Sequence, residues 1–368
     1  MTTITTRPQE TLTTSLKQKS RSKWVADFAK VQILKRLKDL QTGHLSLKDG
    51  TATHHFGDSS IGIKTTITVH DPRFYGEIAF GGSIGAGEAY MLGYWSADNL
   101  TDVIRLMCLN QSVMDTLEGG YQWLTKPLMK ILHWLNSNTT EGSRKNIAAH
   151  YDLGNDMFAM FLDPTMMYSS AIFNANTPTL QSASELKLKT ICDKLDLKPT
   201  DHVVEIGTGW GGFAIYAATH YGCNITTTTI STQQYALAKS RVKAAGLEDK
   251  ITLLLEDYRD LAGKFDKLVS IEMIEAVGHE FYNTYFAKVG SLLKPNGLAL
   301  IQAITIADQR YESAKASVDF IQRYIFPGSC IPSNTAMLSS VSKVSDLRLF
   351  DLADIGPHYA TTLKIWRE

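Results

Sequence analysis

Hydrophobic residues in the first third of the chain follow helical spacing in some stretches and strand spacing in others. Across residues 24–43, large apolar side chains recur every three or four positions among charged ones, which predicts an amphipathic helix. Residues 63–69 follow a period of two, and the Asp-Gly pair at 49–50 is typical of a hairpin turn. Helical spacing returns over residues 99–135. This part is expected to form a small α+β unit.

The rest of the chain alternates helices with short apolar runs. Because strands separated by helices form parallel sheets with right-handed crossovers, the predicted fold class is α/β, with a doubly wound, mostly parallel sheet. Strands are predicted at 202–207, 224–230, 251–257, 267–273 and 298–304, and helices at 184–195, 214–221, 233–245 and 281–293.

Changes in composition set the expected domain limits. Residues 1–22 are polar and contain too few large apolar groups to fold, so a disordered tail is predicted. The α+β domain is expected over 23–135, a polar linker over 136–146, and the larger α/β domain over 147–368.

Overall composition is that of an ordinary globular protein. Lys and Arg together number 37, as do Asp and Glu, so no net charge attracts nucleic acid or an anionic bilayer. Four cysteines are scattered without a C-x-x-C pair, which argues against a zinc site and favours a reducing cytoplasm. We find no secretory signal and no apolar run of membrane-spanning length, and we predict no metal.

A glycine-rich turn follows the first strand of the larger domain. Gly207, Gly209 and Gly212 match the G-x-G-x-x-G dinucleotide pattern, which indicates NAD when an acid follows about 20 residues later. Residues 223–247 contain no Asp or Glu. An acid just before the first glycine, Glu205, instead suits the positive amino end of S-adenosylmethionine. A methyltransferase is therefore favoured over an NAD-dependent oxidoreductase, which remains the alternative.

Several segments resemble the cyclopropane-fatty-acid synthase family of S-adenosylmethionine-dependent methyltransferases. The resemblance covers roughly residues 40–368, and it includes an N-terminal segment similar to the family's lipid-engaging domain. The segments are GEAYMLGYW (87–95), HYDLGNDMFAMFLDPTMMYSSAIF (150–173), EIGTGWGG (205–212), SIEMIEAVG (270–278), FIQRYIFPGSCIPS (320–333) and GPHYATTLKIW (356–366).

The resemblance implies a class I, Rossmann-like methyltransferase fold and a lipid substrate. The expected reaction transfers a one-carbon unit from S-adenosylmethionine to the cis double bond of an unsaturated acyl chain in membrane phospholipid, giving a cyclopropane. The enzyme is expected in the cytoplasm, peripherally associated with the inner face of the membrane and without a nucleic-acid partner. Its oligomeric state is left open, with a homodimer as one option.

The resemblance also implies a cofactor site. Tyr168 and Ser169 are expected to close over the methionine end, with Gly207 and Gly209 beneath it. The amide of Gln234 can bond ribose hydroxyls without a negative charge. The full expected set is Tyr168, Ser169, Glu205, Gly207, Gly209, Thr229, Gln234, Asp257 and Tyr258, with the last two at the adenine. For Tyr258, ordinary core packing explains the residue equally well.

Ring closure requires a base, because a proton must leave the added methyl group. In the family this base is a bound bicarbonate ion, and the resemblance places its cradle at Glu275 and Tyr359, with Gln302, Ile304 and Ser170 around it. Ser170 stands where many members have Cys, and Gln302 where some have His. Glu275 can alternatively be a solvated acid at a helix start, and Gln302 an ordinary strand residue.

Two further expectations concern the outcome of the reaction. Family members usually continue for several tens of residues past the segment at 356–366, so the resemblance implies a carboxyl end lacking helices that cover the acyl tunnel. Related scaffolds give a methyl-branched chain, an exocyclic methylene or a methylated small amine, and a catalytically inactive lipid-binding protein is a further alternative.

Overall fold

The computed structural model describes residues 23–60, 62–118 and 154–368. The chain divides into two compact units, Met1–Ile131 and Leu132–Glu368, each with its own hydrophobic core. The tail predicted at 1–22 and the linker predicted at 136–146 lie outside the described residues, so the expected domain limits stay predictions.

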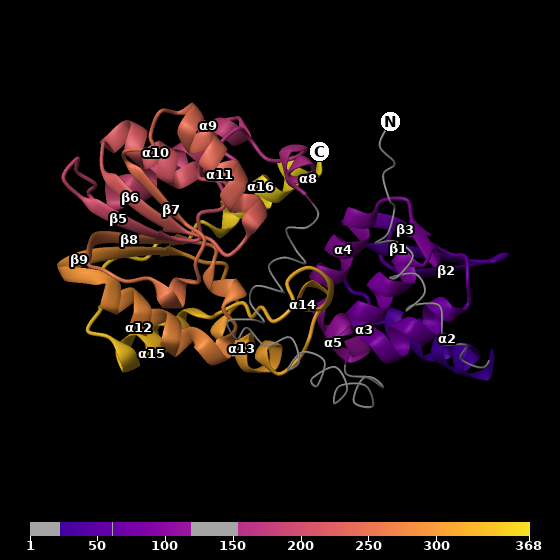
Figure 1. Cartoon of the computed structure of the whole chain (residues 1–368). Helices are drawn as coiled ribbons and strands as arrows, with labels where there is room; N and C mark the ends of the chain where they lie inside the picture. Colours follow the sequence, from indigo (N-terminus) through magenta and orange to yellow (C-terminus); the bar gives the residue numbers. More distant parts are fainter. Residues whose placement is uncertain (1–22, 61, 119–153) are drawn as a thin grey trace. The chain divides into compact units, whose positions relative to one another are not determined.

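The smaller unit combines a four-stranded sheet with helices (Figure 1). The strand order is β2-β1-β3-β4, in which β1 and β3 are parallel and the other pairs are antiparallel. The hairpin predicted at 49–50 is confirmed, and Gly50 adopts a φ of 59° there. The elements are α2 (Lys23–Leu37), β1 (His44–Asp49), β2 (Ala52–Gly57), β3 (Lys64–Val69), α3 (Arg73–Met91), β4 (Trp95–Ala97), α4 (Leu100–Leu109) and α5 (Gln111–Glu118).

Two of the predicted helical stretches differ in extent from the observed helices. The first helix ends at Leu37 instead of near residue 43, and helical structure at 99–118 is divided between α4 and α5. The division falls at Asn110, whose buried side chain accepts from the backbone nitrogens of Gln41 and Thr42 at 2.9 and 3.0 Å. The interruption places the Asn110 amide where its oxygen accepts hydrogen bonds from two backbone nitrogens that follow α2.

The glycines of segment 81–95 have a structural role. Most of this segment belongs to α3, which is kinked at Gly82 (φ 56°, ψ −135°). A Cβ at Gly85 would lie 1.9 Å from the carbonyl oxygen of Glu77, so only glycine allows the two turns to approach so closely.

The larger unit contains five parallel strands in the order β7-β6-β5-β8-β9. The predicted α/β class is therefore confirmed. The strands are β5 (His202–Ile206), β6 (Asn224–Thr228), β7 (Ile251–Leu254), β8 (Phe265–Ile271) and β9 (Leu293–Gln302). The α-helices are α8 (Asn155–Ala159), α9 (Leu180–Lys194), α10 (Gly212–Tyr221), α11 (Thr232–Ala244), α12 (Tyr282–Leu292), α13 (Asp308–Lys315), α14 (Phe320–Tyr324), α15 (Asn334–Val344) and α16 (Gly356–Arg367).

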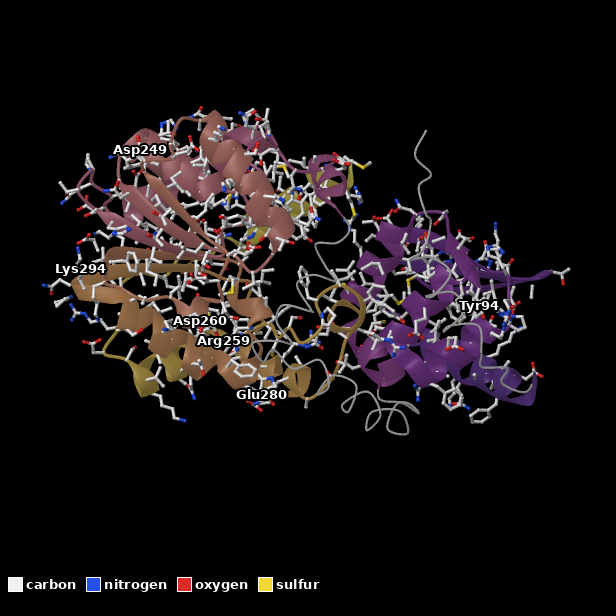
Figure 2. The ribbon with its side chains drawn as sticks, viewed as in Figure 1. Tyr94, Asp249, Arg259, Asp260, Glu280 and Lys294 are labelled. Carbon is white, nitrogen blue, oxygen red and sulfur yellow. The ribbon has the colours of Figure 1, made fainter. Side chains whose placement is uncertain are left out.

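Helices cover both faces of this sheet. Figure 1 shows α9, α10 and α11 on one face and α12 and α15 on the other, with a separate buried apolar cluster on each side. Figure 2 labels Asp249 and Lys294 on the left of the unit, near the amino ends of β7 and β9, and Arg259 farther to the right.

The strand order reverses direction between β5 and β8, and in open parallel sheets ligands bind at the carboxyl ends beside such a reversal. Among the described residues, no helix has the length and apolar content needed to cross a membrane.

Candidate active site

The turn between β5 and α10 is built from glycines in left-handed conformations. Gly207, Gly209 and Gly211 have φ angles of 99°, 51° and 85°. A Cβ at Gly209 would meet no atom within 4 Å, whereas one at Gly212 would lie 2.5 Å from the carbonyl oxygen of Thr165. The backbone at Gly209 is therefore open to a ligand, while Gly212 is required by packing.

The carboxyl end of β6 carries two of the predicted cofactor residues. The Thr229 hydroxyl donates to the Gln234 side-chain oxygen at 2.8 Å, and both side chains are buried. Ser231 accepts from the Gln234 backbone nitrogen and caps α11. Because this arrangement uses the amide oxygen, the amide nitrogen of Gln234 is the group left to donate to a ligand.

The chain after β7 carries the other pair. Asp257 is 1% exposed and forms a bidentate ion pair with Arg259, with both distances 2.7 Å. The Arg259 backbone nitrogen also donates to this carboxylate, at 3.0 Å. The Tyr258 hydroxyl is buried and has no hydrogen-bond partner among the described residues. A buried hydroxyl without a hydrogen-bond partner costs free energy, so a ligand that forms a hydrogen bond with it would bind more tightly.

A buried polar layer lies beneath these strand ends. Glu205 accepts from the Thr227 hydroxyl at 2.6 Å, and burial raises the pKa of Glu205 to about 8. Lys187, on α9, has no exposed surface, and its ammonium donates to the Ser169 hydroxyl at 2.6 Å. Burial lowers the pKa of Lys187 to about 8, against the pull of Glu272, Asp163 and Glu205.

Sequence reasoning missed Lys187, although the sequence contains a signal for it. Lys187 lies at helical spacing from Ala183, Ser184 and Ile191, all on the buried face of α9. A lysine on such a face is rarely buried without a partner. Its position predicts a buried anion nearby.

Glu272, just after β8, is the centre of the second cluster. One of its carboxylate oxygens accepts from the Ser170 backbone nitrogen and from the Gln302 side-chain nitrogen, each at 2.8 Å. The Tyr359 hydroxyl also bonds this carboxylate. Burial raises the pKa of Glu272, and the Ser170 N–H, the charge of Lys187 and the other two donors oppose that rise. Glu272 as a residue is only partly buried.

Glu275 lies one turn farther along the chain and differs from Glu272 in its partners. One carboxylate oxygen accepts from the Ile304 backbone nitrogen, and the other is buried without a hydrogen-bond partner among the described residues. Burial, followed by the neighbouring charge of Glu272, raises the pKa of Glu275 to about 8. Glu275 is therefore mainly a neutral acid at pH 7, beside a carboxylate surrounded by donors.

Aromatic rings form one wall of this region. Tyr168 stacks on Trp366 of α16 with ring centroids 5.3 Å apart, and its edge meets Phe158 of α8 at 5.2 Å. Tyr359 lies edge-on to Trp366 at 6.2 Å, and Phe158 also packs against Trp210. Ring faces attract cations, by about 0.5–2 kcal/mol each, and such walls exclude water.

The predicted site residues thus fall into two groups. Most of the cofactor candidates follow the carboxyl ends of β5, β6 and β7, and Glu205 is buried within β5. Tyr168 and Ser169 come instead from the loop between α8 and α9. The predicted ion cradle comes together, but three of its members, Ser170, Gln302 and Tyr359, bond Glu272 and not Glu275. Sequence reasoning missed Glu272, although it is an acid directly after a strand beside the reversal in strand order.

The residues present suit S-adenosylmethionine better than they suit bicarbonate. For the cofactor, the open turn at Gly209, the Gln234 amide nitrogen and the unsatisfied Tyr258 hydroxyl are groups that a nucleoside with an amino-acid tail can use. For bicarbonate the fit is poor, because the expected donors already surround the Glu272 carboxylate. An added anion would have to displace that carboxylate or lie against it. Within the described ranges, no three His, Cys, Asp or Glu side chains are placed to hold a metal ion.

This sheet order, with a glycine turn at the strand reversal, is the Rossmann-like arrangement of class I S-adenosylmethionine-dependent methyltransferases, and the solved structures that it matches belong to that class. Within that class, the chain belongs to the mycolic acid cyclopropane synthetase family, whose model matches residues 138–368. The resemblance to cyclopropane-fatty-acid synthases is thereby confirmed, and S-adenosylmethionine is favoured over NAD at the glycine turn.

Relatives with curated descriptions span most of the chain. The tuberculostearic acid methyltransferase of Mycobacterium tuberculosis is 38% identical over 354 residues, which cover 92% of this chain and 81% of that protein. The cyclopropane-fatty-acyl-phospholipid synthase of Escherichia coli is 39% identical over 305 residues, covering 82% and 75%.

Solved structures show the same likeness. The cyclopropane synthase MmaA2 from Mycobacterium tuberculosis aligns with a TM-score of 0.56 and 29% identity over 61% of this chain and 81% of that one. The mycolic acid cyclopropane synthase CmaA1, solved in complex with SAH and CTAB, aligns with the same TM-score and coverage at 30% identity.

Proposed function

We propose that this methyltransferase transfers a one-carbon unit from S-adenosylmethionine to the cis double bond of an unsaturated acyl chain in membrane phospholipid, forming a cyclopropane. The observation that carries the proposal is the Glu272–Glu275 pair, in which a carboxylate surrounded by donors adjoins a neutral acid, near an aromatic wall. Support also comes from the Escherichia coli relative, whose name specifies a fatty-acyl-phospholipid substrate.

For the cofactor, we assign the adenosyl group to the ends of β5, β6 and β7. The open backbone at Gly207 and Gly209 would lie beneath the methionine portion, with Tyr168 and Ser169 over it. S-adenosylmethionine supplies an electrophilic methyl group there. The assignment is supported by the SAH complex of CmaA1, which shares 30% identity with this chain.

Thr229 and Gln234 are assigned to the ribose and amino-acid portions, and Asp257 and Tyr258 to the adenine. The Gln234 amide nitrogen and the unsatisfied Tyr258 hydroxyl support these roles, because each is a buried polar group with bonding capacity to spare. Glu205 is assigned to the amino end through the buried layer, where it neighbours Lys187.

The alkene chemistry requires a dry site that tolerates positive charge. An unactivated double bond is a weak nucleophile, so attack on the methyl group leaves a cation on the neighbouring carbon of the acyl chain. The rings of Tyr168, Trp366 and Tyr359 are suited to stabilise such a cation. A base must then remove a proton from the added methyl group so that the ring can close.

Bicarbonate as that base stays a prediction from the resemblance. Its expected cradle of Glu275, Tyr359, Gln302, Ile304 and Ser170 is present, but the Glu272 carboxylate takes up the bonds of three of these residues.

A methyl-branched product is the second candidate. It is favoured by the name of the tuberculostearic acid methyltransferase, which aligns with 92% of this chain. The cation is the same, but loss of a proton from the chain gives an alkene, and a saturated branch needs a hydride donor in addition. Methylation of a small amine is a more distant alternative.

One assay separates these outcomes. Vesicles of monounsaturated phospholipid are incubated with methyl-labelled S-adenosylmethionine, and the lipid product is examined by mass spectrometry and proton NMR. Cyclopropanation predicts a gain of one CH2, loss of the alkene signals and upfield ring protons, with one S-adenosylhomocysteine formed per product. An exocyclic methylene has the same mass but keeps alkene protons. Label that never reaches lipid, despite cofactor binding, would support the inactive lipid-binding alternative.

We propose that the enzyme associates peripherally with the inner face of the membrane and that its lipid-engaging domain is the smaller unit. Vesicle flotation with and without that unit tests the association. Light scattering during gel filtration tests the homodimer.

A further inference from the structure

The carboxylate of Glu272 occupies the point on which the donors of three distant segments converge. The Ser170 nitrogen comes from the loop after α8, the Gln302 amide from the end of β9, and the Tyr359 hydroxyl from α16. The Gln302 amide nitrogen also lies 3.4 Å from the Ser170 carbonyl oxygen, which links two of these segments to each other. A small anion with three oxygens would need the same donors.

The backbone of Glu272 is adapted to this position. Its φ is 47°, a left-handed backbone value that residues other than Gly, Asn and Asp rarely adopt. The Glu272 backbone nitrogen donates to the Gln302 carbonyl oxygen at 2.8 Å, which holds Glu272 beside β9 at the carboxyl end of β8. Backbone strain of this kind persists when surrounding contacts fix it, and it is concentrated at functional sites.

The neighbouring charges distinguish Glu272 from Glu275. Glu272 has three hydrogen-bond donors and the charge of the buried Lys187 nearby, all of which favour the carboxylate. Glu275 has two backbone donors, the Ile304 nitrogen and its own, and its other oxygen is unpartnered among the described residues. Because two adjacent carboxylates do not readily ionise together, Glu272 keeps the charge and Glu275 keeps the proton.

We propose that Glu272 is the general base of this enzyme, a built-in carboxylate at the point where the family resemblance predicts a bicarbonate ion. The inference rests on the proposed transfer to an acyl double bond. After the alkene bonds to the methyl carbon and the carbon–sulfur bond breaks, an oxygen of Glu272 takes one proton from that methyl group. The electrons of the broken C–H bond form the third ring bond, and Glu272 becomes a neutral acid that later returns its proton to solvent.

Two variants of Glu272 separate its roles. Glu272→Gly removes the carboxylate, relieves the left-handed backbone and frees the three donors, which leaves room for an ion. Glu272→Gln keeps the shape but cannot act as a base, and it leaves no room for an ion. Glu280→Gln is the matched control, because Glu280 is an exposed acid eight positions along the same segment, labelled at the surface in Figure 2.

Turnover is measured in carbon-dioxide-free buffer and again with added bicarbonate. The wild-type enzyme and Glu280→Gln are expected to give the same rate in both buffers. Glu272→Gly is expected to lose about 10²–10⁴-fold without bicarbonate, the usual contribution of a general base, and to recover part of it when bicarbonate is added. The turnover rate of Glu272→Gln is expected to fall by the same factor, about 10²–10⁴, in both buffers.

A second measurement does not depend on turnover. Equilibrium dialysis with labelled bicarbonate, on protein loaded with S-adenosylhomocysteine, is expected to show binding to Glu272→Gly and none to the wild-type enzyme. Urea unfolding and S-adenosylhomocysteine affinity establish that each variant is folded and loaded. The inference is overturned if the wild-type enzyme binds bicarbonate or needs it for turnover, or if Glu272→Gly keeps its rate without it. If the wild-type enzyme labels no lipid, the proposed function fails, and the dialysis still decides whether the carboxylate replaces the ion.

Discussion

The ammonium of Lys187 lies 2.6 Å from the hydroxyl oxygen of Ser169, and the lysine has no exposed surface. This contact joins α9 to the loop that carries Tyr168, Ser169 and Ser170. The same charge favours the ionised forms of Glu205 and Glu272, which belong to different parts of the site. A single buried cation therefore connects the proposed cofactor site with the proposed base.

Replacing Lys187 with Met should destabilise the protein and weaken cofactor binding. Removal of one partner from a buried charge cluster costs about 3–5 kcal/mol of unfolding free energy, because the remaining charges are left uncompensated. Urea unfolding and calorimetric titration with S-adenosylhomocysteine measure the two effects. The control is Lys189→Met, since Lys189 is on the same helix but its side chain is 57% exposed and paired with Asp193 at the surface. That variant should change stability by less than about 1 kcal/mol. Equal effects of the two substitutions would refute the assigned role of Lys187.

Glu275→Gln should change the pH dependence of stability. The folded-state pKa of Glu275 is raised from its ordinary 4.5 to about 8, so its contribution to stability is complete below pH 4.5 and is lost as pH rises through 8. Glutamine does not titrate. The unfolding free energy of the variant, relative to wild type, should therefore rise by a few kcal/mol between pH 5 and pH 8.5.

Urea unfolding at three pH values within this range measures the effect. The exposed acid variant Glu280→Gln serves as control. A flat difference for Glu275→Gln would mean that Glu275 titrates normally in the folded protein.

Gly209→Val should abolish cofactor binding, with a loss of stability no larger than that caused by the left-handed backbone. A Cβ at Gly209 would meet no protein atom within 4 Å, so a side chain there would begin in the space assigned to S-adenosylmethionine, while the φ of 51° imposes a cost of about 1–2 kcal/mol. We expect at least a 100-fold loss of S-adenosylhomocysteine affinity by calorimetry.

Gly246→Val is the matched comparison for Gly209→Val. Gly246 has a φ of 65°, and a Cβ added there would also meet no atom within 4 Å, but it lies in the turn between α11 and the amino end of β7, not at the carboxyl ends of the strands. It should show a similar loss of stability with unchanged affinity. If Gly209→Val kept its affinity for S-adenosylhomocysteine, the assignment of the cofactor to this turn would be wrong.

Gly212→Ala should destabilise the protein for a different reason, which is close packing. Its Cβ would lie 2.5 Å from the Thr165 carbonyl oxygen and 2.6 Å from the Met167 sulfur, so the start of α10 or the loop must shift. Overpacking of this kind costs about 1–3 kcal/mol, measurable as a lower urea midpoint. Full stability would show that the loop containing Thr165 adjusts freely.

Local patterns were enough to predict most of the fold. The alternation of apolar strands and amphipathic helices predicted the five parallel strands, because side-chain periodicity reflects which face is buried. The glycine turn was recognisable for a similar reason, since its conformation depends on a few adjacent residues. The helix boundary near Leu37 and the break at Asn110 were missed, because a buried amide satisfied by a distant segment leaves no periodic signal.

The sequence by itself determined the sheet, the glycine turn and the residue types at the strand ends. Only the tertiary structure decided which acid receives the donors, because Ser170 and Glu272 are 102 positions apart and Gln302 is a further 30 away. Which of two nearby carboxylates holds the charge depends on the hydrogen bonds, burial and fixed charges that folding places around each. Those contacts arise from chain segments that have no sequence relationship to one another.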